Sequence, residues 1–212
     1  MIKLYPALLT NQPEQMVESL GFVQQGSFEG LHIDIIDSAA GQQTLNLDQV
    51  LGILEASQVD LNKIDLHLMS QAAIDQVTVT STSARVILEY EIDQYLVEQR
   101  IIEFASRGLK TKIGLAIAPK TELESIKHLV DQIGHLLFMA VEFGQQGNNL
   151  DQTVFDKVRQ ARQELSGIEF GWDGGVNLDN LRQIDKLVNL INAGSAVYAS
   201  KDILRAYNSL IQ

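Results

Sequence analysis

The chain contains no cysteine among its 212 residues. Disulfide bonds, thiolate nucleophiles and cysteine-ligated metal sites are therefore excluded. Cations are also scarce, since 16 Lys and Arg stand against 27 Asp and Glu and give a formal net charge of −11. That balance argues against binding to nucleic acid or to an anionic membrane surface, both of which need clustered cations. A small phosphorylated ligand stays compatible, because helix N-termini and backbone amides bind phosphate without side-chain cations.

Long apolar runs are missing as well. No stretch approaches the roughly 18 consecutive apolar residues of a membrane-spanning helix. The opening residues, Met1-Ile-Lys-Leu-Tyr-Pro6, lack a charged region followed by a long apolar segment, so no secretory signal is predicted. With 45% hydrophobic residues the chain can bury a substantial core. These features predict a soluble cytoplasmic protein with one domain over residues 1–212.

Eight short runs rich in Val, Ile and Leu recur along the chain. They are Ile2–Leu9, Gly30–Ile36, Lys63–Met69, Arg85–Tyr90, Thr111–Ala118, Leu136–Val141, Ile168–Trp172 and Leu187–Ile191. Most are nearly continuous in apolar residues, which favours strands that are buried on both faces of a parallel sheet.

Amphipathic stretches of helical period separate these runs. They are Gln12–Leu20, Leu47–Ala56, Glu91–Arg107, Thr121–Ile133, Leu150–Leu165 and Leu178–Lys186. A further helix is predicted over Gln71–Ala84, although Val77–Thr82 has strand propensity. Strands alternating with helices in this number predict the α/β class and a closed (β/α)8 TIM barrel.

Four polar residues lie in or at the ends of the predicted strands. His32 and Asp34 belong to the second run, His67 to the third, and Asp173 follows the seventh. Barrel active sites lie at the C-terminal ends of the strands, so all four would share one mouth. Two imidazoles and two carboxylates can hold a divalent metal and leave a position open for substrate. Taken singly, each has a plainer interpretation as an internally bonded or structural residue.

Two small-residue turns follow the last two predicted strands. They contain Gly174 with Gly175, and Gly194 with Ser195. Such turns either simply reverse the chain or present backbone amides to a phosphate, and barrels frequently bind phosphate at these two loops. Trp172 is interpreted as a packing residue. His128 and His135 are interpreted as structural and facing away from the mouth.

In this order, the segments resemble the ribulose-phosphate 3-epimerase family over nearly the whole chain. The motifs that carry the resemblance are Pro6–Thr10, His32-Ile-Asp34-Ile-Ile-Asp37, His67-Leu-Met69, Gly114–Thr121, Met139–Glu142, Asp173-Gly-Gly175 and Gly194–Val197. The resemblance implies a barrel of the ribulose-phosphate-binding type. It also implies one divalent ion held by His32, Asp34, His67 and Asp173, with zinc expected first and iron, manganese or cobalt also compatible.

The same resemblance implies a reaction. Asp34 would remove the C3 proton of D-ribulose 5-phosphate and Asp173 would return a proton to the other face, giving D-xylulose 5-phosphate. The metal would stabilise the enediolate between the two steps. The sugar phosphate would contact His67, and its phosphate would lie on amides of a glycine-rich set: Gly144, Gly147, Gly174, Gly175, Gly194 and Ser195. Family members are commonly dimers or larger, so a homo-oligomer is expected.

The chain departs from the family pattern around this site. Ala7, Ser38 and Glu89 stand where the family has Ser, Gly and His. The loop that follows Ser38, around Ala40–Gln43, also differs, and Phe143–Gly147 lacks the family's proline. These departures leave open a non-catalytic or altered-substrate barrel that binds a sugar phosphate. A metal-dependent aldolase or decarboxylase is disfavoured, because Asp34-Ile-Ile-Asp37 lacks the lysine typical of that group.

Overall fold

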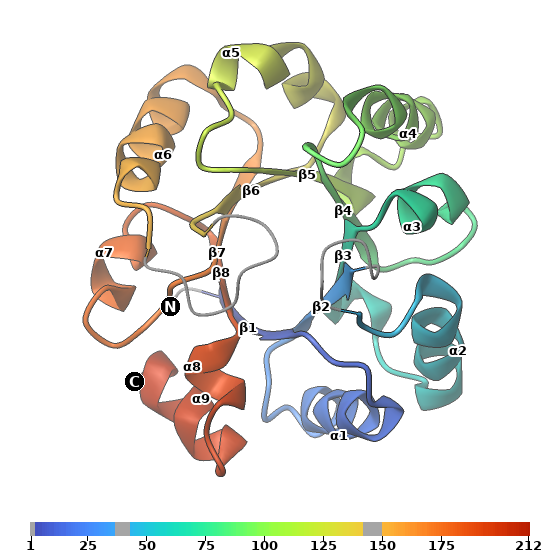
Figure 1. Ribbon diagram of the computed structural model, residues 1–212, viewed down its shortest axis with the longest axis vertical. Coiled ribbons are helices and arrows are strands. Elements are labelled where there is room, and N and C mark those ends of the chain that lie inside the picture. The colour runs from blue at the N-terminus through green and yellow to red at the C-terminus, as the bar shows by residue number, and fades with distance from the viewer. Residues whose placement is uncertain (1–2, 37–42, 142–149) are drawn as a thin grey trace.

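Eight parallel strands close into a barrel in chain order, with the last hydrogen-bonded to the first (Figure 1). A computed structural model describes residues 3–36, 43–141 and 150–212. The strands are β1 Lys3–Leu8, β2 Leu31–Ile36, β3 Ile64–Met69, β4 Arg85–Glu89, β5 Ile113–Ile117, β6 His135–Met139, β7 Glu169–Asp173 and β8 Leu190–Ala193. The predicted (β/α)8 barrel is confirmed.

Helices surround the barrel on its outside (Figure 1). The α-helices are α1 Pro13–Gln24, α2 Leu47–Ser57, α3 Gln71–Gln76, α4 Gln94–Ser106, α5 Leu123–Ile126, α6 Thr153–Glu164, α7 Leu181–Asp185, α8 Ser195–Tyr198 and α9 Ile203–Ile211. Short 3-10 turns lie at η2 Leu61–Lys63, η3 Lys110–Lys112 and η4 Lys127–Gln132. Residues at the N-termini of several helices explain where those helices begin. Pro13 occupies the first turn of α1, and Asn46 and Gln49 form a reciprocal capping box on α2.

Two predicted helices are much shorter than expected. The prediction over Gln71–Ala84 is wrong beyond Gln76, because the hydroxyl groups that follow bond locally instead of continuing the helix. The Thr78 amide donates to Ser81 Oγ, for example. The helix expected over Leu178–Lys186 begins only at Leu181, since the Asn177 side chain accepts backbone hydrogen bonds in the preceding turn.

Two further boundaries differ from the prediction. The eighth strand is displaced from Leu187–Ile191 to Leu190–Ala193, because the amides of Leu187 and Val188 still bond back to Ile184 in the turn of α7. The stretch Thr121–Ile133 divides into α5 and η4. Neither α8 nor α9 is predicted from the sequence.

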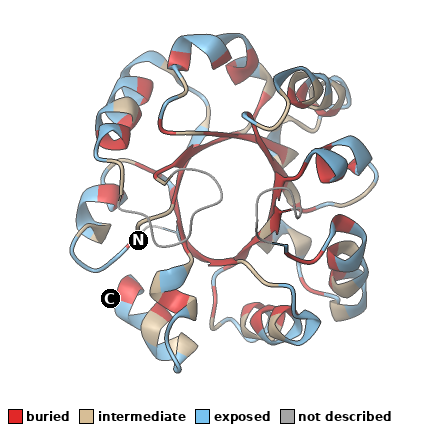
Figure 2. Cartoon of the chain, viewed as in Figure 1, coloured by how far each residue is buried: buried red, intermediate tan, exposed pale blue. Residues whose placement is uncertain are grey.

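The barrel wall is buried on both faces, whereas the helices expose their outer sides (Figure 2). Apolar side chains fill the layer between strands and helices, and a smaller apolar group of Ile87, Ala116, Leu137 and Met139 forms a separate buried cluster. Polar side chains are buried alongside it. Those on the strands are His32, Asp65, His67, Glu89, His135, Asp173 and Asn192. Burying a polar group without a partner is costly, so these residues are the candidates for a functional site inside the barrel.

No helix within the described ranges is both long enough and apolar enough to cross a membrane.

Candidate metal centre

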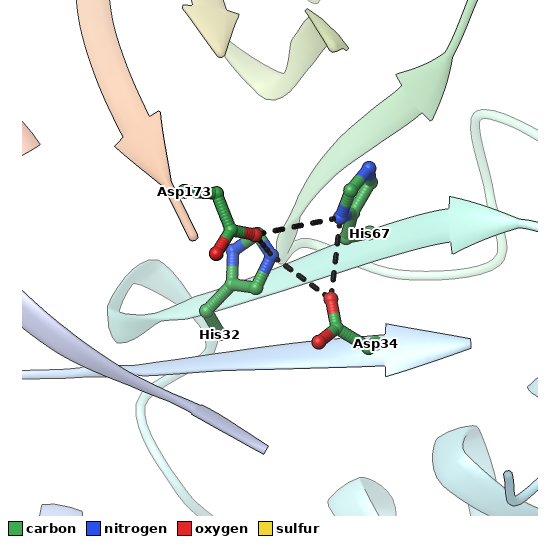
Figure 3. A group of neighbouring side chains, drawn as sticks. All are labelled: His32, Asp34, His67 and Asp173. Carbon is green, nitrogen blue, oxygen red and sulfur yellow. Dashed lines mark hydrogen bonds and ion pairs between the residues drawn. The ribbon is translucent and has the colours of Figure 1, made fainter. Parts of the chain in front are cut away.

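Four polar side chains from three strands meet at the C-terminal mouth of the barrel (Figure 3). His32 and Asp34 lie two residues apart on β2, so both point to the same face of that strand. Asp34 pairs in register with His67 on β3, and Asp173 ends β7. The structure therefore brings together all four residues that the sequence suggested as metal ligands.

The donor atoms of this cluster are His32 Nε2, Asp34 Oδ1, His67 Nδ1 and Asp173 Oδ2. Asp34 Oδ1 lies 3.2 Å from the nearest nitrogen of each histidine. Asp173 Oδ2 lies 3.5 Å from His32 Nε2 and 4.0 Å from His67 Nδ1. Tetrahedral ligands at bond lengths of about 2.0–2.1 Å from an ion lie about 3.3 Å apart. The separations from Asp34 match this value and those from Asp173 are longer, so the four side chains are close enough together to share one divalent ion.

Burial supports the same interpretation. Both imidazoles are fully buried, while the side chains of Asp34 and Asp173 keep 13% and 11% of their surface exposed. His32 Nε2 is buried and faces two carboxylates, at 3.2 Å from Asp34 Oδ1 and 3.5 Å from Asp173 Oδ2. A buried nitrogen aimed between two carboxylates suits coordination to a cation. The site is therefore open to solvent on the side of Asp34 and Asp173.

Each histidine has a polar group behind it. His67 Nε2 lies 2.9 Å from Glu89 Oε2. His32 Nδ1 lies 3.0 Å from the side-chain amide of Asn192 on β8. In the structure the amide nitrogen faces Nδ1, and Asn192 Oδ1 has no partner among the described residues. Turning the amide by 180° would let Nδ1–H donate to Oδ1, and a neutral His32 would then keep the lone pair of Nε2 for a metal. Both imidazoles are thus held from the side opposite the cluster.

A second buried network lies below His32. Asp65 Oδ2 is 3.9 Å from His32 Nδ1, and both oxygens of Asp65 accept hydrogen bonds from Arg85, at 2.9 and 2.6 Å. Arg85 also donates to Glu169 Oε2 at 3.0 Å, which links β3, β4 and β7. The pair of Asp65 and Arg85 is therefore bidentate and nearly enclosed.

The sequence indicated Glu89 as a departure from the family pattern near the site, but the prediction missed Asp65, Arg85 and Asn192 as its neighbours. A signal for Asp65 and Arg85 was present in the strands. Asp65 lies two residues before His67, and Arg85 lies four residues before Glu89, so each pair shares a strand face. For Asn192, 160 residues from His32 in the chain, only the closed barrel provides the contact.

The cluster shifts the pKa values of its own members. Burial alone would lower the pKa of His32, but the carboxylates of Asp34 and Asp65 raise it to about 9. For His67 the same opposition between burial and the carboxylates of Asp34 and Glu89 raises the pKa to about 10. In the metal-free protein both imidazoles are therefore protonated at neutral pH.

The pKa values of the two carboxylates in the cluster shift in opposite directions. Burial would raise the pKa of Asp34, yet hydrogen bonding to His32 and His67 lowers it to about 2. Burial raises the pKa of Asp173 to about 6, although the nearby imidazoles oppose this. Burial would also raise the pKa of Asp65, but the Arg85 guanidinium holds it well below its usual range.

The predicted phosphate-binding turns lie at the same mouth. Gly174 and Gly175 adopt left-handed conformations, with φ of +96° and +65°, which favour glycine. A Cβ on Gly174 would also lie 2.8 Å from Val141, so packing contributes to the need for glycine there. Gly194 precedes α8, and Ser195 is its first residue. Gly144 and Gly147 lie outside the described residues.

The residues interpreted as structural have separate environments. Trp172 is fully buried, packs on Phe155 and donates to the Gly174 carbonyl, as the packing interpretation predicts. His128 is exposed beside Glu98. His135 is fully buried on β6, and burial, with the charge of Arg85, lowers its pKa well below the ordinary value.

Fold and site together define a (β/α)8-barrel protein with a candidate divalent-metal centre at its C-terminal mouth. Residues 3–198 match the Ribulose-phosphate 3 epimerase family, and the chain belongs to that family. The predicted family and the prediction of an isomerase of this type are thereby confirmed.

Relatives agree with this assignment over nearly full length. Ribulose-phosphate 3-epimerase 1 of Cupriavidus necator is 28% identical, with 99% of this chain and 90% of the relative covered. Ribulose-phosphate 3-epimerase of Bacillus subtilis is 26% identical, with 99% and 98% covered. A solved structure of a mutant tryptophan synthase α-subunit from Pyrococcus furiosus aligns with a TM-score of 0.72 at 16% identity, covering 99% of this chain and 96% of that one. This last likeness concerns the fold alone.

Proposed function

We propose that this protein catalyses metal-dependent inversion at C3 of a ketose phosphate, interconverting D-ribulose 5-phosphate and D-xylulose 5-phosphate or a close analogue. The observation that carries the proposal is the convergence of His32, Asp34, His67 and Asp173, each with one ligand atom within 4.8 Å of the others. Membership of the ribulose-phosphate 3-epimerase family supports the choice of reaction.

The four residues would hold one divalent ion, with zinc the first candidate because two imidazole nitrogens and two carboxylate oxygens suit it. When bound, the ion supplies positive charge that offsets the negative charge developing on the substrate oxygens as the C3 proton leaves. Such compensation is needed because a proton beside a carbonyl is too weakly acidic for an aspartate acting alone.

Asp34 and Asp173 are the proposed proton acceptor and donor. As the C3–H bond breaks, Asp34 takes the proton and the bonding electrons move toward C2 and its oxygen, which gives an enediolate. Asp173 then delivers its proton to the opposite face of C3, and the carbonyl reforms with inverted configuration. Asp34 ends protonated and Asp173 ionised, so the reverse reaction uses the same pair in exchanged roles.

The remaining residues would bind and orient the substrate. His67 would contact the sugar, and amides near Gly174, Gly175, Gly194 and Ser195 would receive its phosphate. Gly144 and Gly147 belong to the same prediction. Backbone amides bind a phosphate without adding side-chain cations, which agrees with the strongly negative chain.

Solvent exchange tests the proposal directly. The metal-loaded protein should incorporate deuterium at C3 of D-ribulose 5-phosphate in heavy water, measured by NMR over a panel of ketose phosphates. Exchange confined to another ketose phosphate would keep the mechanism and replace the substrate. Absence of exchange with every member, by protein shown to contain metal, would contradict the proposed activity.

An altered-substrate or non-catalytic sugar-phosphate-binding barrel is the second candidate. Two buried residues favour it. Ala7, in register with His32, presents a methyl group that cannot hydrogen-bond, and Glu89 adds a third carboxylate beside the cluster. Binding of a sugar phosphate without exchange would support this alternative over the epimerase.

A further inference from the structure

Glu89 lies outside the four-residue cluster but contacts one of its members. It ends β4 with a side chain only 1% exposed, and its Oε2 lies 2.9 Å from His67 Nε2. The other nitrogen of His67, Nδ1, faces Asp34 and Asp173. A single imidazole therefore connects Glu89 to the candidate metal centre.

The chemistry of this contact fixes where a neutral His67 carries its proton. An ionised carboxylate only accepts hydrogen bonds, so the one N–H of the neutral ring lies on Nε2 and points to Glu89. Nδ1 is then unprotonated, which is the state in which a histidine nitrogen coordinates a metal. Glu89 thus selects the nitrogen that faces Asp34.

The charge of Glu89 is not neutralised by a lysine or arginine among the described residues, where its recorded ion pair is with His67. Glu91 lies in the turn after β4, and its pKa is raised to about 7 by burial and by the neighbouring Glu89. A cation at the cluster would therefore experience the field of Glu89 through a low-polarity interior.

We propose that Glu89 is a positioning residue that orients His67 through its Nε2–H and strengthens divalent-metal binding at the cluster. The inference rests on the proposed function only in assuming that the cluster binds a metal ion. It makes no assumption about the substrate.

Metal affinity of the full-length protein tests the role. Metal-free wild type and two variants, Glu89→Gln and Glu89→Leu, would be titrated with zinc against a competing chelator. Removing an outer-shell partner of a metal-bound histidine weakens binding by about 10–100-fold, and we expect the Leu variant in this range with the Gln variant less affected. Glu91→Gln is the comparison variant, since it removes the neighbouring carboxylate, which interacts with Glu89 rather than with His67.

A spectroscopic measurement separates positioning from general destabilisation. In the zinc-loaded wild type, nitrogen-resolved NMR should show the His67 proton on Nε2, shifted downfield by Glu89. Glu89→Leu should lose that shift. The Gln variant, which preserves side-chain size, should keep the proton on Nε2 with a smaller shift.

The possible results are distinct. Unchanged zinc affinity in Glu89→Leu, or equal losses in Glu89→Gln and Glu91→Gln, would overturn the positioning role while leaving the proposed function intact. Failure of the wild type to bind any divalent metal would overturn the proposed function and this inference together.

Discussion

The two histidines of the candidate centre are supported in different ways. His67 turns Nε2 toward a buried carboxylate, Glu89, for which the described residues provide no lysine or arginine partner. His32 turns Nδ1 toward a neutral amide, that of Asn192. The nearest carboxylate on that side, Asp65, forms an ion pair with Arg85. Glu89 therefore places near the metal site a negative charge that no described lysine or arginine balances, whereas the charge of Asp65 is balanced by Arg85 within the barrel wall. We expect the His67 side to control metal affinity and the His32 side to control stability.

The largest effect should come from Asp173, one of the two carboxylates that lie near both histidines. Asp173→Asn removes the proposed proton donor, and general acid–base catalysis contributes about 10²–10⁴-fold. We expect deuterium exchange at C3 to fall by that factor while the fold, followed by circular dichroism, persists. A variant that exchanges at the wild-type rate would refute the assignment of Asp173.

On the His32 side, Arg85→Leu should mainly reduce stability. The substitution leaves the buried Asp65 carboxylate without its cation, and breaking such a pair costs about 3–5 kcal/mol. Urea unfolding of the metal-free protein measures the loss. Zinc affinity should change less than in Glu89→Leu. A larger loss of zinc affinity in Arg85→Leu than in Glu89→Leu would contradict the assignment of metal affinity to the His67 side.

A smaller effect is expected at Asn192. Asn192→Ala leaves the buried His32 Nδ1 without its hydrogen-bond partner, which costs about 1–3 kcal/mol. Thermal unfolding of the metal-free protein would detect it. A loss of zinc affinity as large as that of Glu89→Leu would contradict the division, because both histidines would then control metal affinity.

A further test is the dependence of stability on pH. The folded pKa values of His32 and His67, about 9 and about 10, lie above the ordinary value of 6.5. Their contribution to metal-free stability is thus fully present below pH 6.5 and is lost as the pH rises through 9 to 10. Chemical unfolding from pH 6 to pH 10 should show this decline.

Metal binding should remove one proton from each of the two histidines. An ion requires both imidazoles unprotonated, so zinc binding at pH 7 should release about two protons. Calorimetry in buffers of different ionisation enthalpy counts them. Release of none would contradict the protonated state assigned to the metal-free histidines.

Sequence reasoning succeeded where short-range pattern and strand position were enough. The spacing of His32 and Asp34 shows that they share a strand face, and the strand ends bring His67 and Asp173 to the same mouth. It failed where side chains competed with the backbone, as after Gln76. It also failed where contacts depend on barrel closure, because no local pattern shows that Asn192 lies behind His32.

Anomalous diffraction from zinc-loaded crystals tests the central claim most directly. We predict a single zinc peak at the mouth, about 2.0–2.2 Å from His32 Nε2, His67 Nδ1 and one oxygen each of Asp34 and Asp173. The nitrogen of His67 that faces Glu89 should remain protonated and unbound. A zinc ion coordinated by His67 Nε2, or no zinc between these four residues, would contradict the account.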